Sequence, residues 1–89
     1  MQIQKILIVE SPVHLFRLIR AKEEVLDLAS DEEYHLLISF LDIVDLFLNG
    51  CKCDEEANYS EMMSIYEAIR NYSQDNLKNA FECDRIEFK

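Results

Sequence analysis

The fold is decided by residues 30–50, SDEEYHLLISFLDIVDLFLNG. Three acids follow Ser30, and Glu33 completes the S-x-x-E spacing of a capping box, which marks a helix start. Negative charge in this first turn also favours the positive end of the helix dipole. Gly50 supplies the stop, because glycine readily takes the left-handed conformation that follows many helices. We therefore expect one helix from this capping box to about Leu48.

This helix is apolar over most of its circumference, which is typical of a helix buried between neighbours. We expect it to be the central helix of the domain. Spacings of three and four predict an inward seam of Leu37, Phe40, Leu41, Val44, Phe47 and Leu48. Three more apolar residues lie off that seam and need cover from other helices or from a second copy of the chain: Ile38, Ile43 and Leu46.

Before the central helix, Ser11-Pro12 predicts another helix start, because serine caps well and proline suits the first helical position. Its apolar residues recur at helical spacing as far as Ala29, with Lys22 as the one charged residue on that face. We expect the aliphatic stem of this lysine to cover the edge of the core while its amine reaches water.

After the central helix, residues 51–59 read as an acidic loop. Ser60 is expected to cap a third helix, and Ser73 a short fourth helix from Gln74 to about Glu82. The inward face of the third helix is predicted to consist of Met62, Ile65, Tyr66, Ile69 and Tyr72. That of the fourth is predicted to consist of Leu77, Ala80 and Phe81.

The two ends of the chain stay open at this point. The β-branched run from Ile6 to Val9 and the alternation at Ile86 and Phe88 allow the termini to pair as a short two-stranded β unit. A helix over residues 2–10 fits the same apolar spacing. The predicted fold class is all-α, a small bundle of about four helices, with this question about the termini attached.

The chain has 89 residues, which predicts a single domain over residues 1–89. A monomer of this size buries roughly 64% of the surface of its unfolded chain, enough for one compact core. Apolar residues make up 49% of the sequence and can fill that core. One Gly and one Pro argue against a turn-rich β sandwich or barrel.

The net charge of −9 argues against binding by general attraction to nucleic-acid phosphates or anionic lipids. Residues 23–67 alone carry a net −12. The acids there form two clusters, each with a tyrosine beside it that could anchor a partner. The candidate partner-binding residues are Glu23, Glu24, Asp27, Asp31, Glu32, Glu33 and Tyr34 in the first cluster, and Asp54, Glu55, Glu56, Tyr59 and Glu61 in the second.

Metal and cofactor sites are not expected. Cys51-Lys52-Cys53 gives one pair of thiols, and a zinc site would have to draw its other ligands from Cys83, His14 or His35 in separate elements. The acidic loop lacks the glycine of a calcium-binding loop. We read the three cysteines as small reduced thiols.

Catalysis and membrane insertion are not expected either. His35, Ser39 and Asp42 share a stripe of the central helix, but spacing alone brings them together and no glycine-bearing oxyanion loop accompanies them. The sequence shows no signal peptide and no apolar run long enough to span a membrane. An odd number of cysteines does not close a disulfide framework, so we expect a soluble cytoplasmic protein.

The hypothesis that follows is a non-enzymatic acidic module that binds a basic, nucleic-acid-processing protein, as an inhibitor, an immunity-type partner or a mimic of DNA. The alternative is a structural or assembly subunit that forms a homodimer through its apolar central helix.

Overall fold

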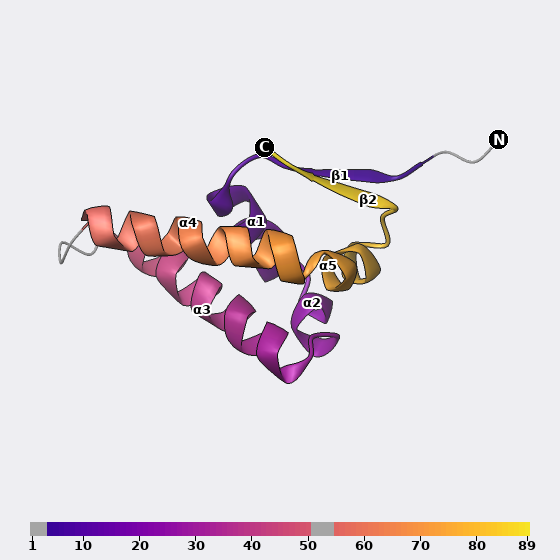
Figure 1. The fold of residues 1–89 in the computed structure, drawn as a ribbon, viewed down its shortest axis with the longest axis horizontal. Coiled ribbons are helices and arrows are strands. Elements are labelled where there is room, and N and C mark those ends of the chain that lie inside the picture. The colour runs from indigo at the N-terminus through magenta and orange to yellow at the C-terminus, as the bar shows by residue number, and fades with distance from the viewer. Residues whose placement is uncertain (1–3, 51–54) are drawn as a thin grey trace.

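The computed structural model describes residues 4–50 and 55–89. In chain order the elements are β1 (Ile6–Val9), α1 (Pro12–Ala21), α2 (Glu24–Asp27), α3 (Asp31–Leu48), α4 (Glu55–Tyr72), α5 (Gln74–Phe81) and β2 (Arg85–Phe88). The two long helices, α3 and α4, form an antiparallel hairpin, and α1 lies across it (Figure 1). The first and last strands, β1 and β2, lie side by side at the edge of this small helical bundle (Figure 1). The predicted fold class is confirmed.

The strand pair settles the question left open at the termini. β1 and β2 run parallel, with Ile6 opposite Arg85 and Val9 opposite Phe88. Parallel strands need a crossover between them, and here all five described helices form it. Val9 and Ile86 are buried against the helices, whereas Ile6 is exposed on the outer face.

The first predicted helix ends earlier than its apolar spacing suggested. α1 is capped as expected, with the Ser11 hydroxyl accepting a hydrogen bond from the His14 backbone N–H. The helix ends at Ala21, because the backbone of Lys22 is extended, and α2 then forms a separate turn. This break turns Val25 into the core, where its carbonyl accepts a hydrogen bond from the Asn76 side chain at 3.0 Å. The contacts of Val25 with the core and with α5 therefore stabilise this break more than an uninterrupted helix from α1 into α2 would.

Lys22 lies at the edge of the core, as predicted, and is half-buried. Its amine does not simply reach water, since it lies 5.9 Å from the centroid of the Phe81 ring. At this distance the ammonium is attracted by the negative face of the ring. The lysine thus links the end of α1 to α5.

The central helix α3 has the predicted bounds. The Ser30 hydroxyl accepts from the Glu33 backbone N–H, which is the serine half of the predicted capping box. The Glu33 carboxylate accepts from the Ser30 hydroxyl at 3.0 Å rather than from the Ser30 backbone N–H. The buried part of its seam comprises Leu37, Phe40, Leu41 and Val44, joined by Ile43.

The last turn of α3 departs from the prediction. Phe47 is 37% exposed and Leu48 is 45% exposed, so the seam does not continue to the end of the helix. Leu46 is equally exposed, whereas Ile43 is covered within the single chain. Helices α1 and α4 therefore supply the cover that the middle of α3 needs.

Helix α4 begins at Glu55, so the expectation that Ser60 caps it is wrong. Residues 55–59 are therefore helical rather than a loop, and two acidic residues, Glu55 and Glu56, suit the first turn because negative charge there favours the helix dipole. On its inward face Met62, Tyr66 and Ile69 are buried, while Tyr72 is 78% exposed and lies off the core. The prediction for Tyr72 is therefore wrong.

Helix α5 has the predicted position, but its start differs in detail. Ser73 precedes it and is fully buried, yet its side chain forms no capping hydrogen bond. The helix ends at Glu82, which takes the left-handed conformation at φ 52°. Leu77 and Ala80 are buried as expected, and Phe81 packs at the edge of the core.

Candidate functional site

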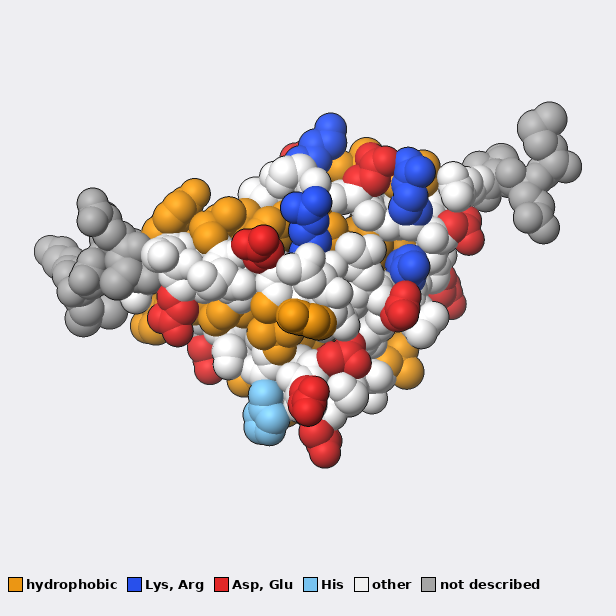
Figure 2. Space-filling view, in the orientation of Figure 1, with side chains coloured by type: hydrophobic (Ala, Val, Ile, Leu, Met, Phe, Trp, Pro, Cys, Tyr) orange, Lys and Arg blue, Asp and Glu red, His pale blue; other side chains and the backbone are white. Residues whose placement is uncertain are grey.

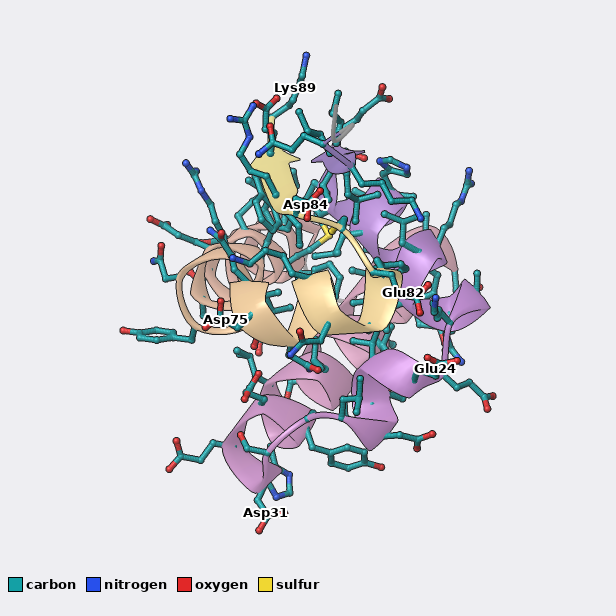
Figure 3. All side chains as sticks on the ribbon, turned by 90° about the vertical axis from the view of Figure 1, so that its right-hand side faces the viewer. Glu24, Asp31, Asp75, Glu82, Asp84 and Lys89 are labelled. Atoms are coloured by element: carbon teal, nitrogen blue, oxygen red, sulfur yellow. The ribbon has the colours of Figure 1, made fainter. Side chains whose placement is uncertain are left out.

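The residues of the first acidic cluster lie on two consecutive elements, and we call them the acidic corner: Glu23, Glu24, Asp27, Asp31, Glu32 and Glu33. It is built from α2 and the first turn of α3, which are separated by only the short link 28–30. Figure 3 shows Glu24 and Asp31 at the surface of this part of the molecule. All of its residues are exposed except Glu33, which is half-buried because it belongs to the capping box. Tyr34 is exposed beside them, as predicted.

The acidic corner has no internal compensation of its charge. Within residues 4–50 and 55–89, the salt bridges join Arg20 to Asp45, Lys78 to Asp75, and Arg85 to Glu87. None of them involves a carboxylate of the corner. On the face shown in Figure 2, acidic side chains lie in both halves, whereas lysine and arginine side chains gather in the upper half and are not seen at the lower edge where α3 begins. The corner is thus an uncompensated negative surface.

A hollow of about 350 Å³ opens beside the acidic corner. It is lined by Ser30, Glu32, Glu33, Leu36 and Tyr72. The hollow lies between the start of α3 and the end of α4, and it combines two carboxylates with the exposed ring of Tyr72. Carboxylates attract a guanidinium or ammonium group, and an aromatic face adds a cation–π interaction. A basic side chain fits this chemistry.

The second predicted cluster lies elsewhere. Asp54 is outside the described residues, and Glu55 and Glu56 belong to the first turn of α4, with Tyr59 and Glu61 exposed one turn further on. This end of the hairpin is opposite the acidic corner (Figure 1). Helix α3 has 18 residues and separates the two by about 27 Å at 1.5 Å per residue. The structure therefore divides the predicted partner-binding residues into two surfaces.

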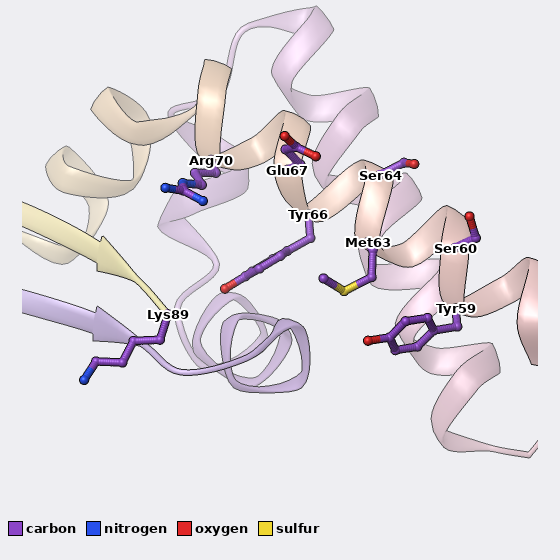
Figure 4. A pocket seen from close by; sticks show the side chains of 8 residues that line it. All are labelled: Tyr59, Ser60, Met63, Ser64, Tyr66, Glu67, Arg70 and Lys89. Carbon is purple, nitrogen blue, oxygen red and sulfur yellow. The ribbon is translucent and has the colours of Figure 1, made fainter.

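A groove that the sequence did not suggest runs along α4 (Figure 4). Its volume is about 560 Å³, and it is lined by Tyr59, Ser60, Met63, Ser64, Tyr66, Glu67, Arg70 and Lys89. The spacing 59, 63, 66, 70 places four of these residues in one row on the helix, because residues three and four apart are neighbours. Lys89, which follows β2, lines the groove from outside the helix.

Tyr66 is the most unusual residue of this groove. Only 6% of it is exposed, and its ring lies 6.3 Å from the Phe40 ring and 5.7 Å from the Phe88 ring, centroid to centroid. Its hydroxyl is buried and has no hydrogen-bond partner among the described residues. Burial raises the pKa of this hydroxyl above its ordinary value, and the positive charge of Arg70 offsets part of that rise. The neutral phenol is therefore the stable form, and it lacks an acceptor.

The sequence did contain a signal for this groove. Tyr66 was placed with the apolar residues of the third helix because its spacing fits the core. A tyrosine at a core position brings a hydroxyl that needs a partner when it is buried. Arg70 stands one turn later on the same row, so a buried donor and a cation are adjacent. Periodicity alone does not identify such a pair.

The polar stripe of α3 has the predicted position and no further organisation. His35, Ser39 and Asp42 are all exposed, and no hydrogen bond joins them in the part of the chain that the structure describes. Asp42 and Asp45 line a shallow hollow of about 360 Å³ near the end of the helix. Asp45 is paired with Arg20 at 3.3 Å through one of its two carboxylate oxygens.

Cys51 and Cys53, the candidate metal ligands, lie outside the described residues. Cys83 is half-buried and reduced, and burial, followed by the negative charge of Asp84, raises the pKa of its thiol. A raised pKa lowers the fraction of reactive thiolate. His14 accepts a hydrogen bond from the Glu10 backbone N–H at 3.0 Å. Across residues 4–50 and 55–89, no group of three or more His, Cys, Asp or Glu side chains could hold a metal ion.

Among the described residues, no helix combines the length and apolar character needed to cross a membrane. Comparison with known proteins leaves the two candidate surfaces as the basis for function: no family model, no curated protein and no solved structure matches this chain.

Proposed function

We propose that this protein is a non-enzymatic binding module whose acidic corner docks on a basic protein. The observation that supports this proposal is the absence of any salt bridge to the acidic corner within the described part of the chain. Uncompensated carboxylates on one surface attract a positively charged partner over long range and raise the association rate. Exposed Tyr34 supplies the apolar contact that such a surface otherwise lacks.

The hollow beside the corner gives the interaction a specific feature. An arginine or lysine of the partner would place its charge between Glu32 and Glu33 and its stem against Tyr72. The Glu33 carboxylate already accepts from Ser30, so Glu32 is the freer of the two. A charge-assisted hydrogen bond in such a site is stronger than a contact on the flat surface around it.

The partner class that fits best is a nucleic-acid-processing protein, because such proteins present clusters of lysine and arginine to phosphates. The carboxylates of the acidic corner can bind the same basic surface of the partner to which nucleic-acid phosphates would bind. In this role the chain acts as an inhibitor, an immunity-type partner or a mimic of DNA. No chemical step is assigned to it.

The test compares two triple variants that change the net charge equally. Glu23, Glu24 and Asp27 are replaced by lysine in the first, and Glu10, Asp42 and Glu82 in the second. The probe is a short arginine-rich peptide, and its dissociation constant is measured over a range of salt concentrations. We expect the corner variant to bind about tenfold more weakly at low salt and the control variant to lose much less.

Equal weakening in both variants would show that bulk charge, rather than the acidic corner, attracts the peptide. An affinity of the wild type that does not fall with rising salt would also contradict the proposal, because contacts between exposed charges are screened. Circular dichroism of both variants establishes that the helices are retained.

A second candidate function rests on the last turn of α3. Leu46, Phe47 and Leu48 are consecutive and exposed, and the Phe47 ring lies 6.3 Å from that of exposed Tyr59 on α4. A cluster of exposed large apolar side chains is typical of an interface. This supports self-association as a homodimer through the end of the central helix, rather than through its middle, where Ile43 is buried.

Sedimentation separates this candidate from the first. If the chain self-associates here, replacing Leu46 with glutamate gives a folded monomer, since this residue is outside the core. Ser39→Glu, on the exposed stripe of the same helix, is the matched control and leaves the dimer intact. A wild type that is monomeric at micromolar concentrations would eliminate the homodimer.

A further inference from the structure

The groove on α4 lies outside the acidic corner and combines two groups that both seek an anionic acceptor. The buried Tyr66 hydroxyl has no hydrogen-bond partner among the described residues. Arg70, one turn further along the same row, forms no salt bridge there. We propose that this groove binds a small organic monoanion, a carboxylate on an apolar or aromatic body.

The anionic end of the ligand is assigned by the donors. Figure 4 shows the Tyr66 ring pointing from α4 toward the end of β2, with its hydroxyl between Arg70 and Lys89. A carboxylate oxygen at this position accepts from the tyrosine O–H, and the Arg70 guanidinium supplies the opposite charge. Burying a polar group without a partner is costly, so an acceptor at this hydroxyl is favoured over none.

The other end of the groove determines the body of the ligand. Met63 is half-buried, and the exposed ring of Tyr59 lies one turn before it on the same row. A flexible thioether and an aromatic ring give a surface suited to an aromatic or aliphatic group. Glu67 stands on the rim and repels additional negative charge, which favours a monoanion over a dianion such as phosphate.

Entry requires a small movement. The Tyr66 hydroxyl is closed to solvent in the free protein. Arg70 and Lys89 are both exposed and lie at this end of the groove, so their side chains are the ones that can move aside. A lysine side chain is a flexible stem that ends in a single charged group, and its movement leaves the core unchanged.

The probe is phenylacetate, titrated into isotopically labelled protein and followed by nuclear magnetic resonance. We expect shifts centred on residues 59–70 and a dissociation constant about tenfold lower than that of phenylacetamide, which has the same body without the charge. Inorganic phosphate, the bare anion, is expected to bind more weakly than phenylacetate.

Two variants identify the donors. Arg70→Gln is expected to weaken phenylacetate binding about tenfold, and Tyr66→Phe by about threefold to tenfold, because each removes a hydrogen bond to a charged group. Tyr72→Phe, on the same helix but 78% exposed, and Arg17→Gln, exposed on α1, are the matched controls and should bind as the wild type does.

Equal shifts with phenylacetate and phenylacetamide would overturn the proposal, as would unchanged binding by both Arg70→Gln and Tyr66→Phe. Phosphate binding as tight as that of phenylacetate would show a general anion site and overturn the assignment of an organic ligand. Thermal unfolding of each variant provides the control for folding, and Tyr66→Phe is expected to fold because it removes only the hydroxyl.

Discussion

Helices α3 and α4 have the same length and pack against each other, yet they bury different chemistry. Helix α3 contributes purely apolar side chains to the core, centred on Phe40, and presents its polar groups as an exposed stripe. Helix α4 contributes Met62 and Ile69, but between them it inserts Tyr66 with a hydroxyl that has no partner among the described residues. Helix α3 therefore stabilises the core with apolar contacts alone, whereas α4 places a hydroxyl without a described partner beside a groove.

The difference shows where in this molecule function is best sought. A buried hydroxyl without a partner costs about 1–3 kcal/mol, which a helix built only for packing would avoid by using phenylalanine. On α3 the polar groups that we propose for partner binding are instead on the outside, at the acidic corner, where they cost little folding free energy. Charge on a surface attracts a macromolecule from a distance, while a buried donor selects a small ligand by contact.

The largest effect is expected at the contact between the two arms. Phe40 is fully buried and its ring stacks on that of Tyr66. Phe40→Ala removes this ring and leaves a cavity, which should lower the free energy of unfolding by about 3–5 kcal/mol. Urea denaturation measures it.

Phe47→Ala is the matched control, because it removes the same atoms from a side chain that is 37% exposed on the same helix. We expect its cost to be less than half that of Phe40→Ala. If the two variants lower the free energy of unfolding by similar amounts, the last turn of α3 must be covered in solution. This result would favour self-association, in which a second copy covers it.

A smaller effect is expected at the two helix starts. Ser30→Ala removes the acceptor of the Glu33 backbone N–H and should cost about 1 kcal/mol. Ser60 was predicted to have the same role, but it lies exposed inside α4, so Ser60→Ala should be neutral or slightly stabilising. Thermal or urea unfolding of both variants tests this contrast. A loss at Ser60 as large as that at Ser30 would place the start of α4 at Ser60 after all.

The sequence was sufficient for the parts of the fold that depend on local physics. The capping box at Ser30 and the stop near Gly50 bound α3 correctly, because both act through backbone groups a few residues away. It was not sufficient at Lys22, where apolar spacing continues but the helix ends. After that break, the Val25 carbonyl accepts a hydrogen bond from Asn76, which stands fifty-one residues after Val25 in the chain.

The candidate sites divide in the same way. The acidic corner was predictable, because its residues are close in sequence and lie on adjoining turns. Its distance from the acids near Tyr59 was not predictable from spacing, because it results from the antiparallel hairpin, which places the two clusters at opposite ends. The groove was missed because Tyr66 has core spacing, and spacing reports that a residue is buried without reporting whether its polar atom is satisfied.

The smallest effect is expected at the hydroxyl of Tyr66 itself. Because the group has no partner among the described residues, Tyr66→Phe should raise the free energy of unfolding at neutral pH by about 1 kcal/mol, at the low end of the cost of an unpartnered buried hydroxyl. A free energy of unfolding lower than that of the wild type would mean that the hydroxyl has a partner in solution, such as a bound water.

Alkaline pH sharpens this comparison. Burial raises the pKa of Tyr66 above its ordinary value of 10.0, so the unfolded chain loses this proton at lower pH than the folded protein does. The folded state then binds more protons, and its stability falls as pH rises above about 10. Tyr66→Phe lacks this loss, so its advantage over the wild type should grow as the pH rises through about 10. Cys83 also has a raised pKa, but it is present in both proteins and cancels in the difference. A parallel pH dependence of Tyr66→Phe and the wild type would mean that the Tyr66 hydroxyl is not buried as the structure has it.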